Sequence, residues 1–237
     1  MRGIEYVQLV ASLPALGPIL AAKTAPINRV RLHARLQQML RPEHLAEIQA
    51  AASLLAWERQ ALLTTDADFV SHARKVIPTL KSEALRRLVY EDVEQRTVVA
   101  ALRRRHAERD APAVGEIWGY GRYVDRIRAK WQEPDFGLGQ SLKWVLPAKE
   151  KLDKADAAGL ERILLDAAWR LADRLVGDHD FDFEAVALYV VRWDLLERWT
   201  RYDAEAAAAR FGALVADALN AAPAGLNADA DLVREAA

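Results

Sequence analysis

The longest helical pattern in the chain is SEALRRLVYEDVEQRTVVAALRRRHAE, residues 82–108. Several apolar residues recur in it at the spacing of one helix face, namely Leu85, Leu88, Val89 and Val99. This spacing predicts an amphipathic helix that packs against a core. We expect the helix to end before Asp110-Ala-Pro112, because proline and its neighbours are typical of turns.

Helical patterns continue on both sides of this stretch. One apolar stripe follows Pro42, which suits a first helical turn, a second runs from Leu160 to a C-cap at Gly177, and a third begins at Phe211 with Asp203 as its N-cap. Further helices are expected at about 26–40, 66–76, 113–131 and 182–201. Only Tyr6–Leu13 is strand-like, and it has no partner strand. The predicted fold class is therefore all-α, a multi-helix bundle.

Turn chemistry divides the chain. The stretch from Trp131 to Gln140 contains one proline and two glycines, which is typical of a boundary. We expect an N-terminal helical bundle over 1–132, a C-terminal helical segment packing on it over 133–220, and a flexible tail over 221–237.

Composition excludes several classes of protein. The 237 residues carry 33 Lys+Arg and 34 Asp+Glu, and this near-zero balance argues against a general nucleic-acid coat. There is no cysteine, which suits a reducing compartment. No apolar run approaches the roughly 20 residues that cross a bilayer. The first residues do not have the pattern of a secretory signal. We expect a cytoplasmic protein that binds no nucleic acid and does not insert into the membrane.

Catalytic motifs are missing from the sequence. It has no phosphate loop, no Gly-x-Ser-x-Gly elbow and no His-Glu-x-x-His pair. Asp178–Asp182 superficially resembles a calcium loop, but Phe183 stands where the loop needs glycine. Asp180 or Asp182 is instead expected to cap the next helix. We expect no catalytic residue, no cofactor and no metal site, and hence a protein that is not an enzyme.

Charge is unevenly distributed, and this favours protein docking. Residues 103–130 carry a local excess of bases, and the chain from Asp203 onward carries an excess of acids. Opposed patches can orient partners, although ordinary solvated helix faces would give the same pattern. The candidate contacts are Arg103, Arg104, Arg105, Arg122 and Arg126, together with Trp193 and Trp199, which are interleaved with arginines. For both tryptophans a core position is the preferred interpretation, and an interface contact is the alternative.

Asp92 and Arg96 stand four residues apart on the apolar face of the 82–108 helix. A charged pair on such a face is costly to bury unless its members satisfy each other or a partner. The pair is either a buried ion pair that fixes helix register, or a polar hinge between helices or an exposed contact.

Five segments, in this order, resemble a bacterial family that is encoded alongside the V-type ATPase and is distantly related to its C subunit, the counterpart of the eukaryotic d subunit. They are Tyr6-Val-Gln-Leu-Val-Ala-Ser-Leu-Pro14, Arg96–Arg105, Pro134-Asp-Phe-Gly-Leu138, Glu161–Trp169, and Phe183–Val186 with Tyr189, Trp193, Glu197, Arg198 and Trp199. The similarity extends over about residues 6–215. Thr97 departs from it, because relatives are expected to have asparagine there.

The resemblance implies a fold like part of the funnel that the C subunit forms, and a non-catalytic coupling role. A protein of this kind would link the central-stalk subunits to the membrane rotor ring of a V-type rotary ATPase during ion transport. It would lie in the cytoplasm, peripheral to the inner face of the plasma membrane through the complex. The alternative is a helical binding module or assembly factor for the same complex.

Overall fold

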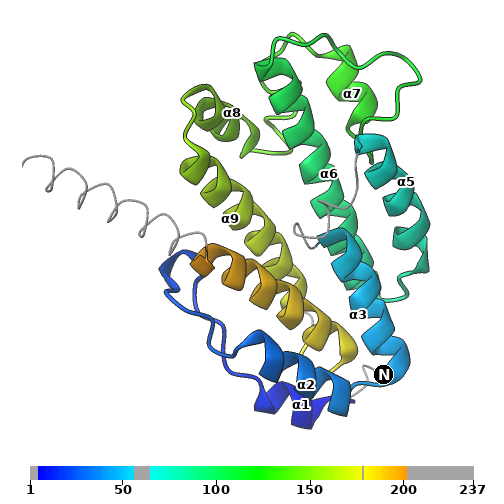
Figure 1. Cartoon of the computed structure of the whole chain (residues 1–237), viewed down its shortest axis with the longest axis vertical. Helices are drawn as coiled ribbons and strands as arrows, with labels where there is room; N and C mark the ends of the chain where they lie inside the picture. Colours follow the sequence, from blue (N-terminus) through cyan, green and yellow to red (C-terminus); the bar gives the residue numbers. More distant parts are fainter. Residues whose placement is uncertain (1–4, 56–64, 178, 202–237) are drawn as a thin grey trace, which may run out of the picture.

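The computed structural model describes residues 5–55, 65–177 and 179–201. All regular elements in these residues are helices, which confirms the all-α prediction (Figure 1). The elements are α1 (Val7–Ser12), η1 (Ile19–Ala21), α2 (Arg29–Met39), α3 (Pro42–Leu55), α5 (Asp66–Val76), η2 (Ile77–Thr79), α6 (Glu83–His106), α7 (Val124–Ala129), α8 (Val145–Asp153), α9 (Ala157–Val176) and a helix over 183–201.

Among the residues that the structure describes, α6 is the longest helix, and it runs from its contact with α3 to its contacts with α7 and α8 (Figure 1). It begins at Ser82, whose hydroxyl accepts a hydrogen bond from the Leu85 backbone N–H at 3.2 Å. Its 24 residues span about 36 Å. The first half, as far as Val93, packs into one hydrophobic core, and the second half, from Val98, packs into another.

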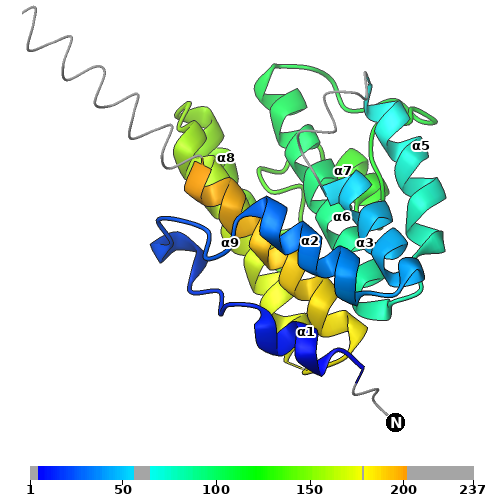
Figure 2. The same ribbon diagram turned by 60° about the horizontal axis from the view of Figure 1, so that its bottom comes forward.

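The first core joins α6 to the N-terminal helices and to the helix over 183–201. Figure 2 shows α1 and α2 lying along that last helix. The backbone N–H groups of Glu5 and Tyr6 donate to the Phe181 carbonyl at 3.1 and 2.8 Å, and the Tyr189 hydroxyl donates to the Pro14 carbonyl at 2.8 Å. These bonds fix the N-terminal segment against residues far away in the sequence.

The second core lies at the far end of α6 and includes residues of α7, α8, the start of α9 and the loops between them. Phe136 and Leu138, from the loop after α7, are completely buried in it. A third, smaller cluster places Ile19 against Leu165, Trp169 and Leu196. The second core contains residues from both sides of position 132, and the division expected there stays a prediction.

Two expectations from the sequence are wrong. Residues 7–12 form α1, so the strand-like interpretation of Tyr6–Leu13 is corrected. Of the helix expected over 113–131, only α7 forms. The stripe from Phe211, the Asp203 cap and the 221–237 tail lie outside the described residues.

Candidate docking surface at the end of α6

Arg105, near the end of α6, binds a loop of its own chain. Its guanidinium donates to the backbone carbonyls of Trp131, Glu133 and Pro134 at 3.1, 2.5 and 2.6 Å. It also lies over the Phe136 ring at 4.1 Å. Burial lowers the pKa of Arg105. The sequence predicts that Arg105 contacts a partner; in the structure its half-buried side chain anchors the loop after α7, and the partner contact stays a prediction.

Asp135 stabilises the same loop by binding backbone N–H groups within it. Its carboxylate accepts hydrogen bonds from the backbone N–H groups of Gly137 and Gly139 at 2.9 and 2.8 Å. The Gly137 amide is the main cause that lowers the pKa of Asp135. Gly137 has a φ of +66°, a conformation that side chains rarely adopt. This geometry explains the order of residues in the Pro134–Leu138 segment, in which the polar groups close the turn and Phe136 and Leu138 fill the core.

A tight turn at residues 113–116 presents apolar side chains to solvent. Arg104 holds the turn by donating to the Asp110 carbonyl at 2.9 Å and to the Glu116 carboxylate at 2.5 Å. The same carboxylate accepts from the Ala113 backbone N–H at 2.8 Å. Val114, at the tip, is 90% exposed, and Ile117 is 43% exposed. Arg104 therefore also has a positioning role, and the turn that it supports is pre-organised.

Two buried polar residues of α6 hold the loop over 119–122. The Thr97 hydroxyl accepts from the Tyr120 backbone N–H at 2.9 Å, and Glu94 Oε1 accepts from the Arg122 backbone N–H at 2.7 Å. Arg122 Nε lies 3.0 Å from Glu94 Oε2, and the Arg122 side chain is otherwise 57% exposed. Burial raises the pKa of Glu94 above its usual range, although both Arg122 contacts oppose the shift. Gly121 has a φ of +96° and passes so close that a Cβ would lie 2.4 Å from Glu94 Cγ.

Arg103 and Arg126 have exposed side chains, and neither forms an ion pair within the part of the chain that the structure describes. Together with the exposed apolar turn they lie at the end of the molecule where α6 ends and α7 packs beside it (Figure 1). We call Arg103, Val114, Ile117 and Arg126 the α6-end surface; Arg122 is bound to Glu94, near the middle of α6, and is not part of it. Residue type alone predicts that the arginines belong to a docking surface, but it does not predict this for Val114 and Ile117.

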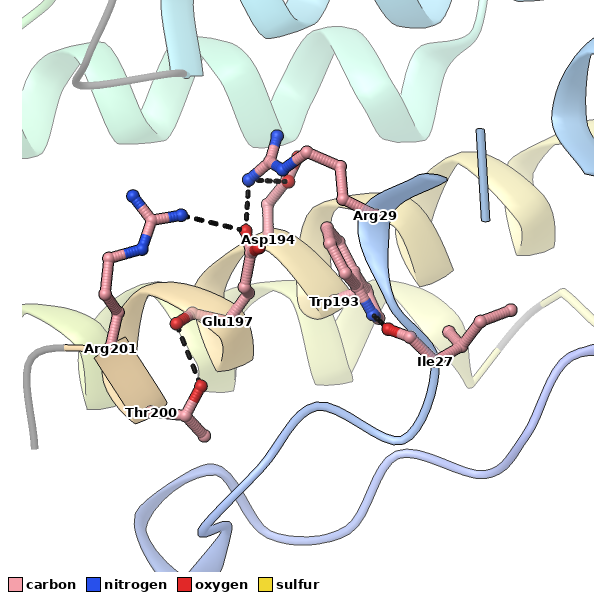
Figure 3. A network of polar contacts seen from close by, with 7 residues as sticks. All are labelled: Ile27, Arg29, Trp193, Asp194, Glu197, Thr200 and Arg201. Atoms are coloured by element: carbon pink, nitrogen blue, oxygen red, sulfur yellow. Dashed lines mark hydrogen bonds and ion pairs between the residues drawn. The ribbon is translucent and has the colours of Figure 1, made fainter. Parts of the chain in front are cut away.

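Trp193 is a core residue, the interpretation preferred from the sequence, and its burial argues against its place among the candidate partner contacts. Its side chain is 2% exposed, and its indole N–H donates to the Ile27 carbonyl at 2.9 Å. Figure 3 shows the polar contacts that surround it, in which Arg29 pairs with Glu197 and with Asp194, the latter at 3.6 Å.

Trp199 is half-buried and packs against the small cluster around Trp169. Of the two tryptophans on the last helix, it is therefore the only one with ring surface left for a partner.

Asp92 and Arg96 lie where α6 meets α3 and α5. Arg96 Nε lies 2.8 Å from Asp92 Oδ2, and both side chains are largely buried, with 10% of Arg96 and 14% of Asp92 exposed. Arg96 Nη2 also donates to the Leu55 carbonyl at the end of α3, at 2.9 Å, and the guanidinium lies over the Phe69 ring of α5. Burial raises the pKa of Asp92 and lowers that of Arg96, against their mutual attraction. The pair thus joins three helices through polar contacts.

The segment before the last helix brings together three side chains of the types that bind cations. His179, Asp182 and Glu184 each place one ligand atom within 4.8 Å of the others. Asp182, however, accepts from the Ala185 backbone N–H at 2.9 Å and lies 2.7 Å from His179 Nδ1. Asp182 is therefore the N-cap of the helix over 183–201. Capping accounts for the arrangement without a metal.

Within the three described ranges, no helix is both long enough and apolar enough to cross a membrane. Comparison of the chain with models of protein families, with known proteins and with solved structures finds no match. The likeness to the V-type ATPase family therefore depends on the five quoted segments.

Proposed function

We propose that the chain is a non-catalytic adapter subunit of a V-type rotary ATPase, which links the central stalk to the membrane rotor ring. The observation that carries the adapter role is the α6-end surface. There, Arg104 and Glu116 hold Val114 in a fixed exposed position, with Arg103 and Arg126 at the same end of the molecule. A pre-organised apolar contact surrounded by charge is the usual arrangement of a protein interface.

The identity of the complex is supported by the five segments and their order along the chain. Three of them have clear physical roles here. Tyr6 binds both Phe181 and His44, Arg105 holds the loop after α7, and the Pro134–Leu138 segment fills the second core. Such residues maintain a rigid body, and a rigid body is what a coupling protein under torque requires.

Affinity purification tests this function. The tagged chain, expressed in its native cell and extracted from membranes with mild detergent, should copurify with the stalk subunits and the rotor ring at one copy per complex. Recovery with incomplete complexes alone would indicate an assembly factor. Recovery of the tagged chain without any other part of the ATPase would contradict both the adapter role and the assembly-factor role.

Paired charge reversals test the surface itself. Arg103→Glu with Arg126→Glu should abolish copurification and leave the fold intact, because both side chains are exposed. The matched control is Arg31→Glu with Arg162→Glu, which reverses two exposed arginines on α2 and α9. Equal loss in both double variants would assign the effect to net charge and would contradict the assignment of the α6-end surface.

A further inference from the structure

A pocket of about 540 Å³ lies at the other end of α6, opposite the α6-end surface. Its walls come from four separate parts of the chain: the N-terminal segment at Glu5, the first turns of α3, the residues 79–82 that lead into α6, and the start of the helix over 183–201. The pocket is therefore a product of the tertiary fold, and no single motif in the sequence indicates it.

Buried contacts make the pocket rigid. Glu47, which is 9% exposed, accepts a hydrogen bond from the Ser82 backbone N–H at 2.6 Å and so joins α3 to the beginning of α6. The His44 ring stacks on the Phe183 ring with centroids 4.0 Å apart, and its Nδ1 lies 2.7 Å from the Tyr6 hydroxyl. A site that is fixed in this way before binding loses little freedom when a ligand enters.

The charges lining the pocket are predominantly negative. The lining includes five carboxylates and two cations besides His44: Glu5, Glu43, Glu47, Asp182 and Glu184 against Arg41 and Lys81. Arg41 already forms ion pairs with Glu5 and Glu43, and its Nε lies 3.5 Å from Glu43 Oε1. Within the residues that the structure describes, neither Glu47 nor Glu184 has a cationic partner.

The favourable interaction of carboxylates with helix N-termini explains the positions of only some of these acids. Glu43 and Glu184 are in first turns, where carboxylates complement the helix dipole, and Asp182 is a cap. Glu47 is in the second turn of α3 and is nine-tenths buried; the Ser82 backbone N–H binds its Oε1, but no cation within the described residues pairs with the carboxylate. A buried carboxylate facing a pocket that is already acidic is stabilised when a cation enters.

We propose that the pocket receives a lysine or arginine side chain of a partner polypeptide. Ala46, Ala50, Leu80 and Phe183 supply apolar wall for the long stem of such a side chain, and the carboxylates supply partners for its charged head. The inference rests on the proposed adapter function and identifies the chemistry of one partner. The adapter would then bind a basic segment at the beginning of α6 and an acidic surface at its end, about 36 Å away.

Fluorescence anisotropy with a labelled short peptide of alternating arginine and lysine tests the pocket on the full chain. The peptide should bind at low salt, and Glu43→Gln with Glu184→Gln should weaken binding about tenfold. The matched control, Glu108→Gln with Glu150→Gln, removes two exposed carboxylates away from the pocket and should bind like the unchanged protein. Thermal unfolding of each variant verifies that the fold is retained.

Three results would overturn the proposal. Peptide binding could be weakened equally in both double variants, or it could be unchanged in the pocket variant. The third result is that the protein binds Zn²⁺ through Glu184 but does not bind the peptide. This test separates the pocket from the adapter function. If the peptide fails to bind while the chain still copurifies with the ATPase, only the pocket is excluded. If the peptide binds but no other part of the ATPase is recovered, the pocket stands and the identity of the complex is excluded.

Discussion

Replacing Arg105 with alanine tests whether an arginine in the basic segment is structural. Arg105→Ala removes hydrogen bonds to three backbone carbonyls and the contact with Phe136 at 4.1 Å. A hydrogen bond contributes about 0.5–1.5 kcal/mol net and a cation–π contact about 0.5–1 kcal/mol at partly exposed sites. Because Arg105 is partly open to solvent, we take the lower third of the summed range of about 2–5.5 kcal/mol, so the free energy of unfolding should fall by about 2–3 kcal/mol.

Urea unfolding followed by circular dichroism measures this change, with Arg103→Ala as the matched control. Arg103 precedes Arg105 by two residues and is exposed, so its replacement should change the free energy of unfolding by less than about 0.5 kcal/mol. In a chain of this length, a loss of about 2–3 kcal/mol lowers Tm by roughly 4–12 °C. Equal stability of the two variants would refute the loop-anchoring role of Arg105 and would return it to the candidate partner contacts.

Three further changes test other parts of the structure. Gly121→Ala should destabilise the chain by about 2 kcal/mol or more in thermal unfolding, because φ is +96° and the new Cβ would meet Glu94, whereas Gly17→Ala, with no atom within 4 Å, should be neutral. Asp135→Asn should cost about 1 kcal/mol at neutral pH. Because two amides lower the pKa of Asp135 below its ordinary 3.8, its ionised form stabilises the fold above about pH 4, and this contribution is lost as pH falls through the lowered pKa, so the two proteins should converge in acid. Trp193→Phe should cost about 1–2 kcal/mol in urea unfolding and leave copurification with the ATPase unchanged, since the ring is buried; lost copurification with retained stability would restore the tryptophan as an interface residue.

Local periodicity is sufficient to predict the helices with a continuous apolar face. The 82–108 pattern predicts α6 to within two residues at each end. The stripe after Pro42 predicts α3, which begins at that proline. Such helices depend on neighbours three and four residues away, and these neighbours are visible in the sequence.

Loops fixed by distant side chains could not be predicted in this way. Residues 113–123 have apolar spacing that fits a helix, but three of their amides donate instead to the side chains of Thr97, Glu94 and Glu116. The segment at Tyr6 has β-branched and aromatic content, yet it forms α1, and the amides of Glu5 and Tyr6 just before this helix bind the Phe181 carbonyl. In both cases a tertiary hydrogen bond outweighs a local preference that amounts to a fraction of a kcal/mol per residue.

The arginines of the basic segment show why residue type could identify the region but not the contacts. Arg103, Arg104 and Arg105 are consecutive on α6, and each successive side chain points about 100° further around the helix axis. Arg105 therefore reaches the loop after α7, Arg104 reaches the 113–116 turn, and Arg103 is the most open of the three to a partner. The two inward arginines hold the loops that carry the apolar tip and fill the second core. Docking through the α6-end surface should accordingly be lost by two separable routes, directly through Arg103 and indirectly through the loss of loop order when Arg104 or Arg105 is removed.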